Sequence, residues 1–150
     1  MTEYETHMEE VLTDGLTLCY VPAPLITPEL CLAAVKQKGS ALLFVPEDLK
    51  TPEMCLVAVR QHGWTLQWVP FEVQTLDICL AAVQQDGSAL SSVGVQNPEI
   101  CLAAVQQWGR ALRWVVNRTP EICLAAISQD PRAEEFSPYS ILELMTLKGS

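Results

Sequence analysis

The chain has 150 residues, of which 49% are hydrophobic, and its 18 acidic and 9 basic side chains give a formal net charge of −9. This length and apolar fraction suffice for one domain with a continuous core. The acidic balance argues against binding to nucleic acid or to anionic membrane surfaces, because both need clusters of Lys and Arg, and it favours a basic partner instead.

The start of the chain predicts neither export nor membrane insertion. Its first residues, MTEYETHMEE, are acidic where a signal peptide is basic and then apolar, and the chain has no run of about 18 uninterrupted apolar residues. We therefore expect a cytoplasmic protein.

Residues 1–26 resemble a capping unit at the start of a repeat array. Val11, Gly15 and Leu18 keep the phase of the units that follow, but His7 stands where those units carry a cysteine. A polar, atypical first unit is what a repeat array needs at an end that faces water.

Five further units of 22 to 24 residues follow, and their cysteines recur at intervals of 24, 24, 22 and 22 residues. Self-similarity at such a period predicts one solenoid domain over residues 1–150. The predicted units are residues 27–50, 51–74, 75–96, 97–118 and 119–137, and a C-terminal capping helix lies in 138–150.

Each unit contains two predicted helical segments. Each unit opens with Thr or Asn, followed by Pro and then an acidic residue, as in Thr51-Pro52-Glu53; one unit has Leu76 in place of the proline. This pattern is typical of a helix start, so a helix of about ten residues is expected from there. Gly39 and its equivalents are expected to end that helix as left-handed C-caps. The following segment suits one or two helical turns, of the α or the 3-10 type, closed by proline; a strand is the weaker alternative, because no period-2 alternation occurs. The prediction is an all-α, right-handed superhelix of about six units.

The repeated cysteines allow two interpretations, a metal or redox ladder and a small buried side chain. We favour the second, because no two cysteines form a C-x2-C pair and only two histidines are present. Stacked helices also lie about 8 to 10 Å apart, too far for a disulfide. No metal ion and no cofactor is expected.

Aromatic residues are candidates for partner binding. Tyr20, Phe44, Trp68 and Trp114 occupy one column of the repeat, which suits either a structural ladder or a binding row, and the first is favoured. Trp64, Phe71 and Trp108 stand where other units carry different residues, and unit-specific aromatics of this kind are typical binding anchors.

Acidic residues fall into two groups. Those after the helix-start prolines are explained by the helix dipole. The variable acids have no such explanation and are further binding candidates: Glu47, Asp48, Glu72 and Asp86.

Catalysis finds no support in the sequence. No phosphate-binding loop occurs, no Ser or Cys stands in a triad pattern that the repeat leaves unexplained, and His62 is isolated at a variable position. We expect a protein that is not an enzyme.

The unit [TN]-P-E-[ILM]-C-L-A-A-V-x-Q-x-G-x-A-L-x-x-V-P resembles a widespread bacterial repeat family of unknown function. The resemblance covers residues 27–130 and, more weakly, 7–26. It implies a short-helix solenoid similar to leucine-rich-variant and armadillo-type arrays.

Size, acidity and architecture together resemble immunity proteins of contact-dependent growth inhibition and other polymorphic toxin systems. The resemblance implies tight one-to-one binding that occludes the active site of a cognate toxin domain, usually basic and often a nuclease. The alternative is a general protein-interaction scaffold or an effector-type repeat protein with several partners.

Overall fold

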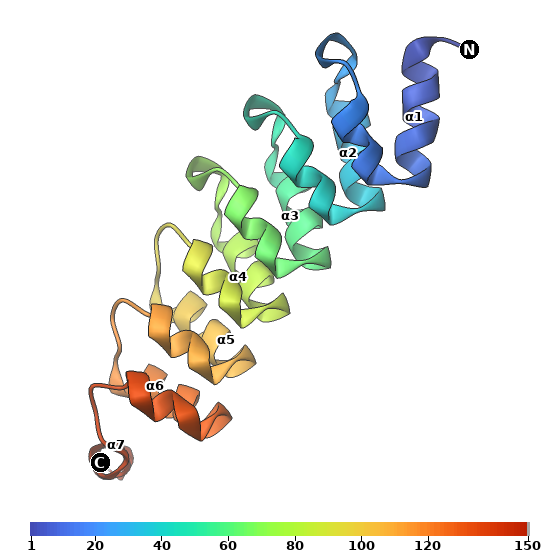
Figure 1. The fold of residues 1–150 in the computed structure, drawn as a ribbon. Helices are drawn as coiled ribbons and strands as arrows, with labels where there is room; N and C mark the ends of the chain where they lie inside the picture. Colours follow the sequence, from blue (N-terminus) through green and yellow to red (C-terminus); the bar gives the residue numbers. More distant parts are fainter. Residues whose placement is uncertain (150) are drawn as a thin grey trace.

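A computed structural model of the chain describes residues 1–149. Helical units stack in sequence order into an elongated array with the two termini at opposite ends (Figure 1). The predicted all-α repeat fold is confirmed, since residues 1–149 contain helices and no strand. No helix in this range combines the length and hydrophobicity needed to cross a membrane.

The α-helices begin where the sequence places their caps. Thr27, for example, accepts a hydrogen bond at Oγ1 from the backbone N of Leu30 at 3.2 Å, and the equivalent bond occurs at Thr51, Thr75, Asn97 and Thr119. The helices are α1 (Glu3–Thr13), α2 (Pro28–Gln37), α3 (Pro52–Gln61), α4 (Leu76–Gln85), α5 (Pro98–Gln107), α6 (Pro120–Gln129) and α7 (Ile141–Lys148).

The second segment of each unit is a 3-10 helix of six residues, as the apolar spacing indicated. These helices are η1 (Gly15–Tyr20), η3 (Gly39–Phe44), η5 (Gly63–Trp68), η7 (Gly87–Ser92), η8 (Gly109–Trp114) and η9 (Pro131–Phe136). The first three units add a short 3-10 turn before the next unit: η2 (Ala23–Leu25), η4 (Glu47–Leu49) and η6 (Phe71–Val73).

The core runs along the array between the α-helices and the 3-10 helices. In the first full unit, Leu30, Cys31, Ala34 and Val35 of α2 and Leu42 of η3 are fully buried, and the same positions are buried in the next three units. Each unit thus shares its apolar side chains with its neighbours in one continuous core.

The prediction of left-handed glycine caps is wrong. No glycine among residues 1–149 has a positive φ. Each of the helices α1 to α5 is capped one residue before the glycine, by an extended residue such as Lys38 (φ −150°, ψ 110°), and the glycine begins the 3-10 helix.

The glycine is required by the neighbouring unit instead. A Cβ at Gly87 would lie 2.7 Å from the carbonyl oxygen of Ala104 in the next unit, well inside van der Waals contact. The same alanine carbonyl faces the glycine at every interface from Gly15 to Gly109. Pro131 takes this place in the last unit, after which no further repeat packs.

A glutamine side chain forms a hydrogen bond between the two units at each of these close contacts. The Oε1 atoms of Gln37, Gln61, Gln85, Gln107 and Gln129 accept hydrogen bonds of 2.5 to 2.6 Å from the backbone N of Gly15, Gly39, Gly63, Gly87 and Gly109 respectively. In three units the Nε2 group also donates to a carbonyl of the preceding unit, as from Gln85 to Gln61 at 3.3 Å. We call these contacts the glycine–glutamine interlock.

A second row of bonds joins the units at their other end. The residue before the caps of α3, α4, α5 and α6 donates to the carbonyl that ends the next 3-10 helix: Lys50 to Trp68, Gln74 to Ser92, Gln96 to Trp114 and Arg118 to Phe136, at 2.7 to 3.0 Å. We call this row the carbonyl ladder.

The type of ladder residue also corresponds to whether the residue two positions after that carbonyl has a backbone N–H to donate. Gln74 and Gln96 each use their Oε1 to accept from the backbone N of Gly94 and Val116, which replace the usual proline. Lys50, which has no acceptor, meets Pro70, which has no N–H to donate.

We predict that Gln85→Met lowers the free energy of unfolding by about 1–3 kcal/mol, because the buried N–H of Gly63 then lacks an acceptor. Gln84→Met is the matched control, since Gln84 is exposed on the same helix and should change stability by less than about 0.5 kcal/mol. Chemical denaturation of both variants measures the difference. Equal stabilities would show that the interlock contributes nothing.

Candidate functional site

The 3-10 helices η1, η3, η5, η7, η8 and η9 lie side by side in a row along one face of the array. The predicted aromatic column occupies their last position, and its exposure varies strongly. Tyr20 is 79% exposed, whereas Trp68 and Trp114 are half-buried and pack against the core. The aromatic side chains of the column therefore cover the core from the middle of the array onward, whereas the first of them, Tyr20, is exposed to solvent.

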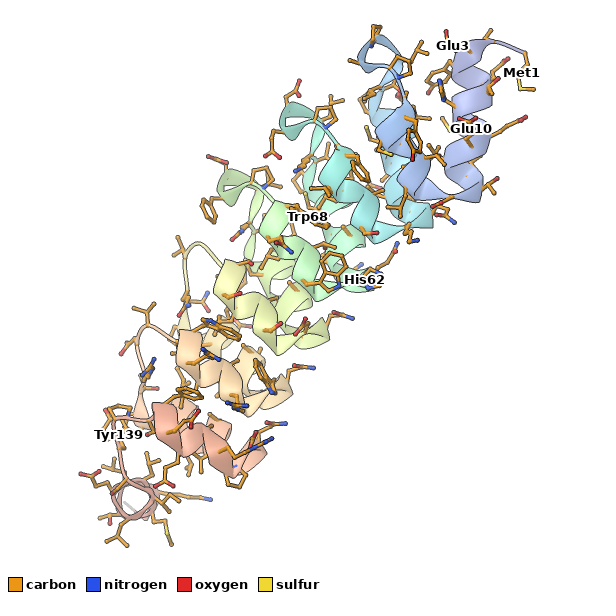
Figure 2. The ribbon with its side chains drawn as sticks, in the orientation of Figure 1. Met1, Glu3, Glu10, His62, Trp68 and Tyr139 are labelled. Atoms are coloured by element: carbon orange, nitrogen blue, oxygen red, sulfur yellow. The ribbon has the colours of Figure 1, made fainter. Side chains whose placement is uncertain are left out.

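Three rings of the third unit of the array form a contiguous cluster on this face. The ring centroids of His62 and Trp64 stack 5.5 Å apart, and those of Trp64 and Trp68 meet edge to face at 5.1 Å. Trp64 remains 41% exposed. Figure 2 shows Trp68 and His62 near the middle of the array.

A surface pocket of about 430 Å³ opens beside Trp68. Its wall brings together three residues that the sequence singled out separately, Glu47, Trp68 and Phe71. The full lining is Leu43, Glu47, Lys50, Gln67, Trp68, Val69, Pro70, Phe71, Gln74 and Ser92. We call this pocket, together with His62 and Trp64, the Trp68 surface.

Phe71 is placed by the following unit. Its ring lies over Gly94, where a Cβ would come within 2.7 Å of the ring carbon Cδ1, so the glycine that replaces proline here makes room for the aromatic ring. Phe71 is nevertheless 72% exposed. The ring is thus supported on one side and open to solvent on the other.

The turns η4 and η6, which contribute Glu47 and Phe71 to the pocket wall, are called here the rim of the pocket, and this rim is negatively charged. The buried Lys50 ammonium donates to Glu47 and, at 2.8 Å, to the carbonyl of Trp68, so its charge offsets that of Glu47. Asp48 and Glu72 lie on the turns η4 and η6, are exposed, and form no ion pair with any residue in 1–149. The net charge at this rim is therefore negative.

Asp86 lies apart from the pocket and has a structural role. Its Oδ1 accepts hydrogen bonds from the backbone N of Ser88 at 2.9 Å and from the Ser88 hydroxyl at 2.6 Å, which caps η7. Asp14 and Asp130 cap η1 and η9 in the same way.

Trp108 and Trp114 lie two units beyond the Trp68 surface. Their ring centroids are 5.6 Å apart, and both rings are half-buried against the core. Two arginines that the sequence did not single out, Arg110 and Arg113, lie next to them on η8 and contact Phe136 of η9. Their signal in the sequence was the same as that of Trp64: residues that differ from the other units at exposed columns.

The repeated cysteines behave as buried apolar side chains. Burial raises the pKa of Cys31 and of Cys55 to about 11, so both stay protonated at neutral pH. All six cysteines are free, and residues 1–149 contain no group of His, Cys, Asp and Glu side chains suited to a metal ion. Only Cys19 is exposed.

Part of the chain is similar to a known family. Residues 27–74, the first two full units, match the family described as "Domain of unknown function (DUF4116)". No curated protein matches the chain, and no solved structure matches it either. The similarity is to a repeat family without an assigned function, and it covers part of the Trp68 surface.

We predict that a thiol reagent such as dithionitrobenzoate modifies Cys19 rapidly at about pH 8, while the five buried thiols react only as fast as the chain opens. The reason is that burial blocks access and disfavours the thiolate. Reaction kinetics followed by mass spectrometry check this. Rapid modification of Cys55 in the folded protein would contradict the buried placement.

Proposed function

We propose that this protein is a protein-binding module and that the Trp68 surface is where a partner protein binds. The observation that carries the proposal is the pair of exposed aromatic residues, Trp64 and Phe71, next to Trp68: Phe71 shares the pocket wall with Trp68, and the Trp64 ring meets that of Trp68 edge to face. Exposed aromatics next to a pocket are the usual anchors of protein interfaces.

Trp64 stays 41% exposed in spite of its ring contacts with His62 and Trp68. His62, two residues before Trp64, occupies the position where Asp14, Asp86 and Asp130 cap their 3-10 helices, and its side chain forms no such bond. Loss of a cap costs about 1 kcal/mol. A stacked His and an exposed Trp at these two positions are thus better explained by binding than by folding.

The rings are also held in place before any partner arrives. Trp64 is stacked on His62 and meets the edge of Trp68, and the Phe71 ring rests on Gly94. Binding then costs less conformational entropy than ordering free side chains would.

The expected partner is basic around an apolar centre. Asp48 and Glu72 lie unpaired at the rim, and the chain as a whole carries a charge of −9. A basic partner would be steered toward this rim, while its apolar side chains fill the pocket.

We predict that Trp64→Ala and Phe71→Ala each weaken partner binding by about tenfold or more, with little change in melting temperature. Tyr20→Ala is the matched control, because Tyr20 is more exposed than Trp64 but lies outside the Trp68 surface. The partner is first captured from the native host by a photo-crosslinking residue at position 67, where the exposed Gln67 lines the pocket, and the affinity of each variant is then measured. Unchanged affinity for both variants would remove the Trp68 surface as the binding site.

Neutralisation of a toxin is the more specific form of this proposal. An acidic rim beside an apolar pocket is complementary to the basic, substrate-binding cleft of a nuclease toxin, and a rigid array is suited to occluding such a cleft.

The test of the toxin hypothesis is growth rescue. Co-expression with the captured partner should restore growth of cells that the partner alone kills, and Phe71→Ala should reduce the rescue more than Tyr20→Ala does. A partner that is harmless when expressed alone, or several partners bound weakly, would favour the general scaffold instead.

A further inference from the structure

The C-terminal end of the 3-10 face holds two arginines over one aromatic ring. The guanidinium carbon of Arg110 lies 6.0 Å from the ring centroid of Phe136, and that of Arg113 lies 5.7 Å from the same centroid. Arg113 also lies 5.3 Å from the ring centroid of Trp114. Two adjacent rings therefore hold both cations at one place.

Arg113 forms no ion pair within the described part of the chain, and Arg110 is only partly neutralised there. The guanidinium of Arg113 forms no hydrogen bond with any residue in 1–149. The Nε of Arg110 is buried without a hydrogen-bond partner in the same range, and its only ion pair is a long contact of 3.5 Å with the exposed Glu135. Like charges brought together raise the free energy unless an anion joins them, and the rings offset only part of this cost.

Arg118 fixes the position of this pair. Its Nη2 donates to the carbonyl of Arg113 at 3.0 Å, its Nε to the carbonyl of Val115 at 3.1 Å, and its Nη1 to the carbonyl of Phe136 at 2.9 Å. The carbonyl-ladder residue of this unit thus joins η8 to η9, and it places Phe136 under both guanidinium groups.

We propose that Arg110 and Arg113 form a receptor for a carboxylate on an acidic peptide segment of a partner protein. The proposal rests on the proposed protein-binding function and gives it a second contact, opposite in charge to the rim of the Trp68 surface. Guanidinium groups with free N–H donors match the geometry of a carboxylate, and stacking on aromatic rings keeps them oriented for it. A nucleic acid is disfavoured as the occupant, because its backbone needs Lys or Arg contacts to several successive phosphates, whereas two guanidinium groups suffice for one carboxylate.

The test is a titration of the full chain with hexaglutamate, followed in ¹H–¹⁵N spectra by the Trp114 indole N–H and the Arg113 Nε–H signals. Saturable shifts of these two signals are expected, with binding about tenfold weaker or worse in Arg113→Gln. Arg60→Gln is the matched control, because it removes one exposed arginine from α3 and should bind as the native chain does.

Several outcomes would overturn the site: no saturable shift, equal binding by Arg113→Gln, or tighter binding of inorganic phosphate than of hexaglutamate. Hexalysine should give no shift of these signals. The spectrum of Arg113→Gln without peptide shows whether that variant is folded. Arg118→Met offers a second variant, expected to weaken binding because it removes all three donors of Arg118 and so releases Phe136 from η8.

The hexaglutamate experiment tests the arginine receptor separately from the Trp68 surface. Trp64→Ala should bind hexaglutamate like the native chain, since Trp64 lies two units away from Arg113. Loss of partner binding in Trp64→Ala without hexaglutamate binding by the native chain would refute the arginine receptor alone. Hexaglutamate binding together with normal partner binding by Trp64→Ala and Phe71→Ala would refute the Trp68 surface alone.

Discussion

The contact between a glycine and the carbonyl oxygen of an alanine in the next unit sets the spacing of the whole array. The two backbones approach so closely that no Cβ fits between them, and the glutamine of the interlock satisfies the glycine N–H that this approach buries. The spacing in turn decides that small residues, Ala104 and its equivalents, line the interface. Every other feature of the unit, including the surface columns, repeats at the distance that this contact imposes.

Local features of the fold were predictable because they depend on residues close together in the sequence. The cap at Thr51, the apolar stripe of α2 and the helical character of residues 39–44 each follow from spacing within one unit. The role of Gly39 was misread because both a left-handed cap and a close backbone contact select glycine, and only the packing of the next unit distinguishes them. The repeated glutamine was visible in every unit, but its partner lies 20 to 22 residues away.

The candidate surface shows the same division between local pattern and tertiary contact. Departure from the repeat identified Trp64 and Phe71, and these two residues lie on one surface with Trp68. It also selected Asp86, which caps its own 3-10 helix, since a variable position is not by itself a free one. The arginines could not be selected from the sequence, because the contact that distinguishes Arg113 is with the ring of Phe136, which lies a full unit further along the chain.

The carbonyl ladder gives the array a fixed order. A ladder glutamine needs an N–H two residues beyond the carbonyl of the next unit, as Gly94 and Val116 provide, whereas Lys50 suits a proline there. Exchanging the second and third full units would set donor against donor, or leave an acceptor empty, at more than one junction. Units that look interchangeable in sequence therefore pack correctly only against particular neighbours. As a result, the exposed side chains of each unit appear at fixed distances from one another along the array.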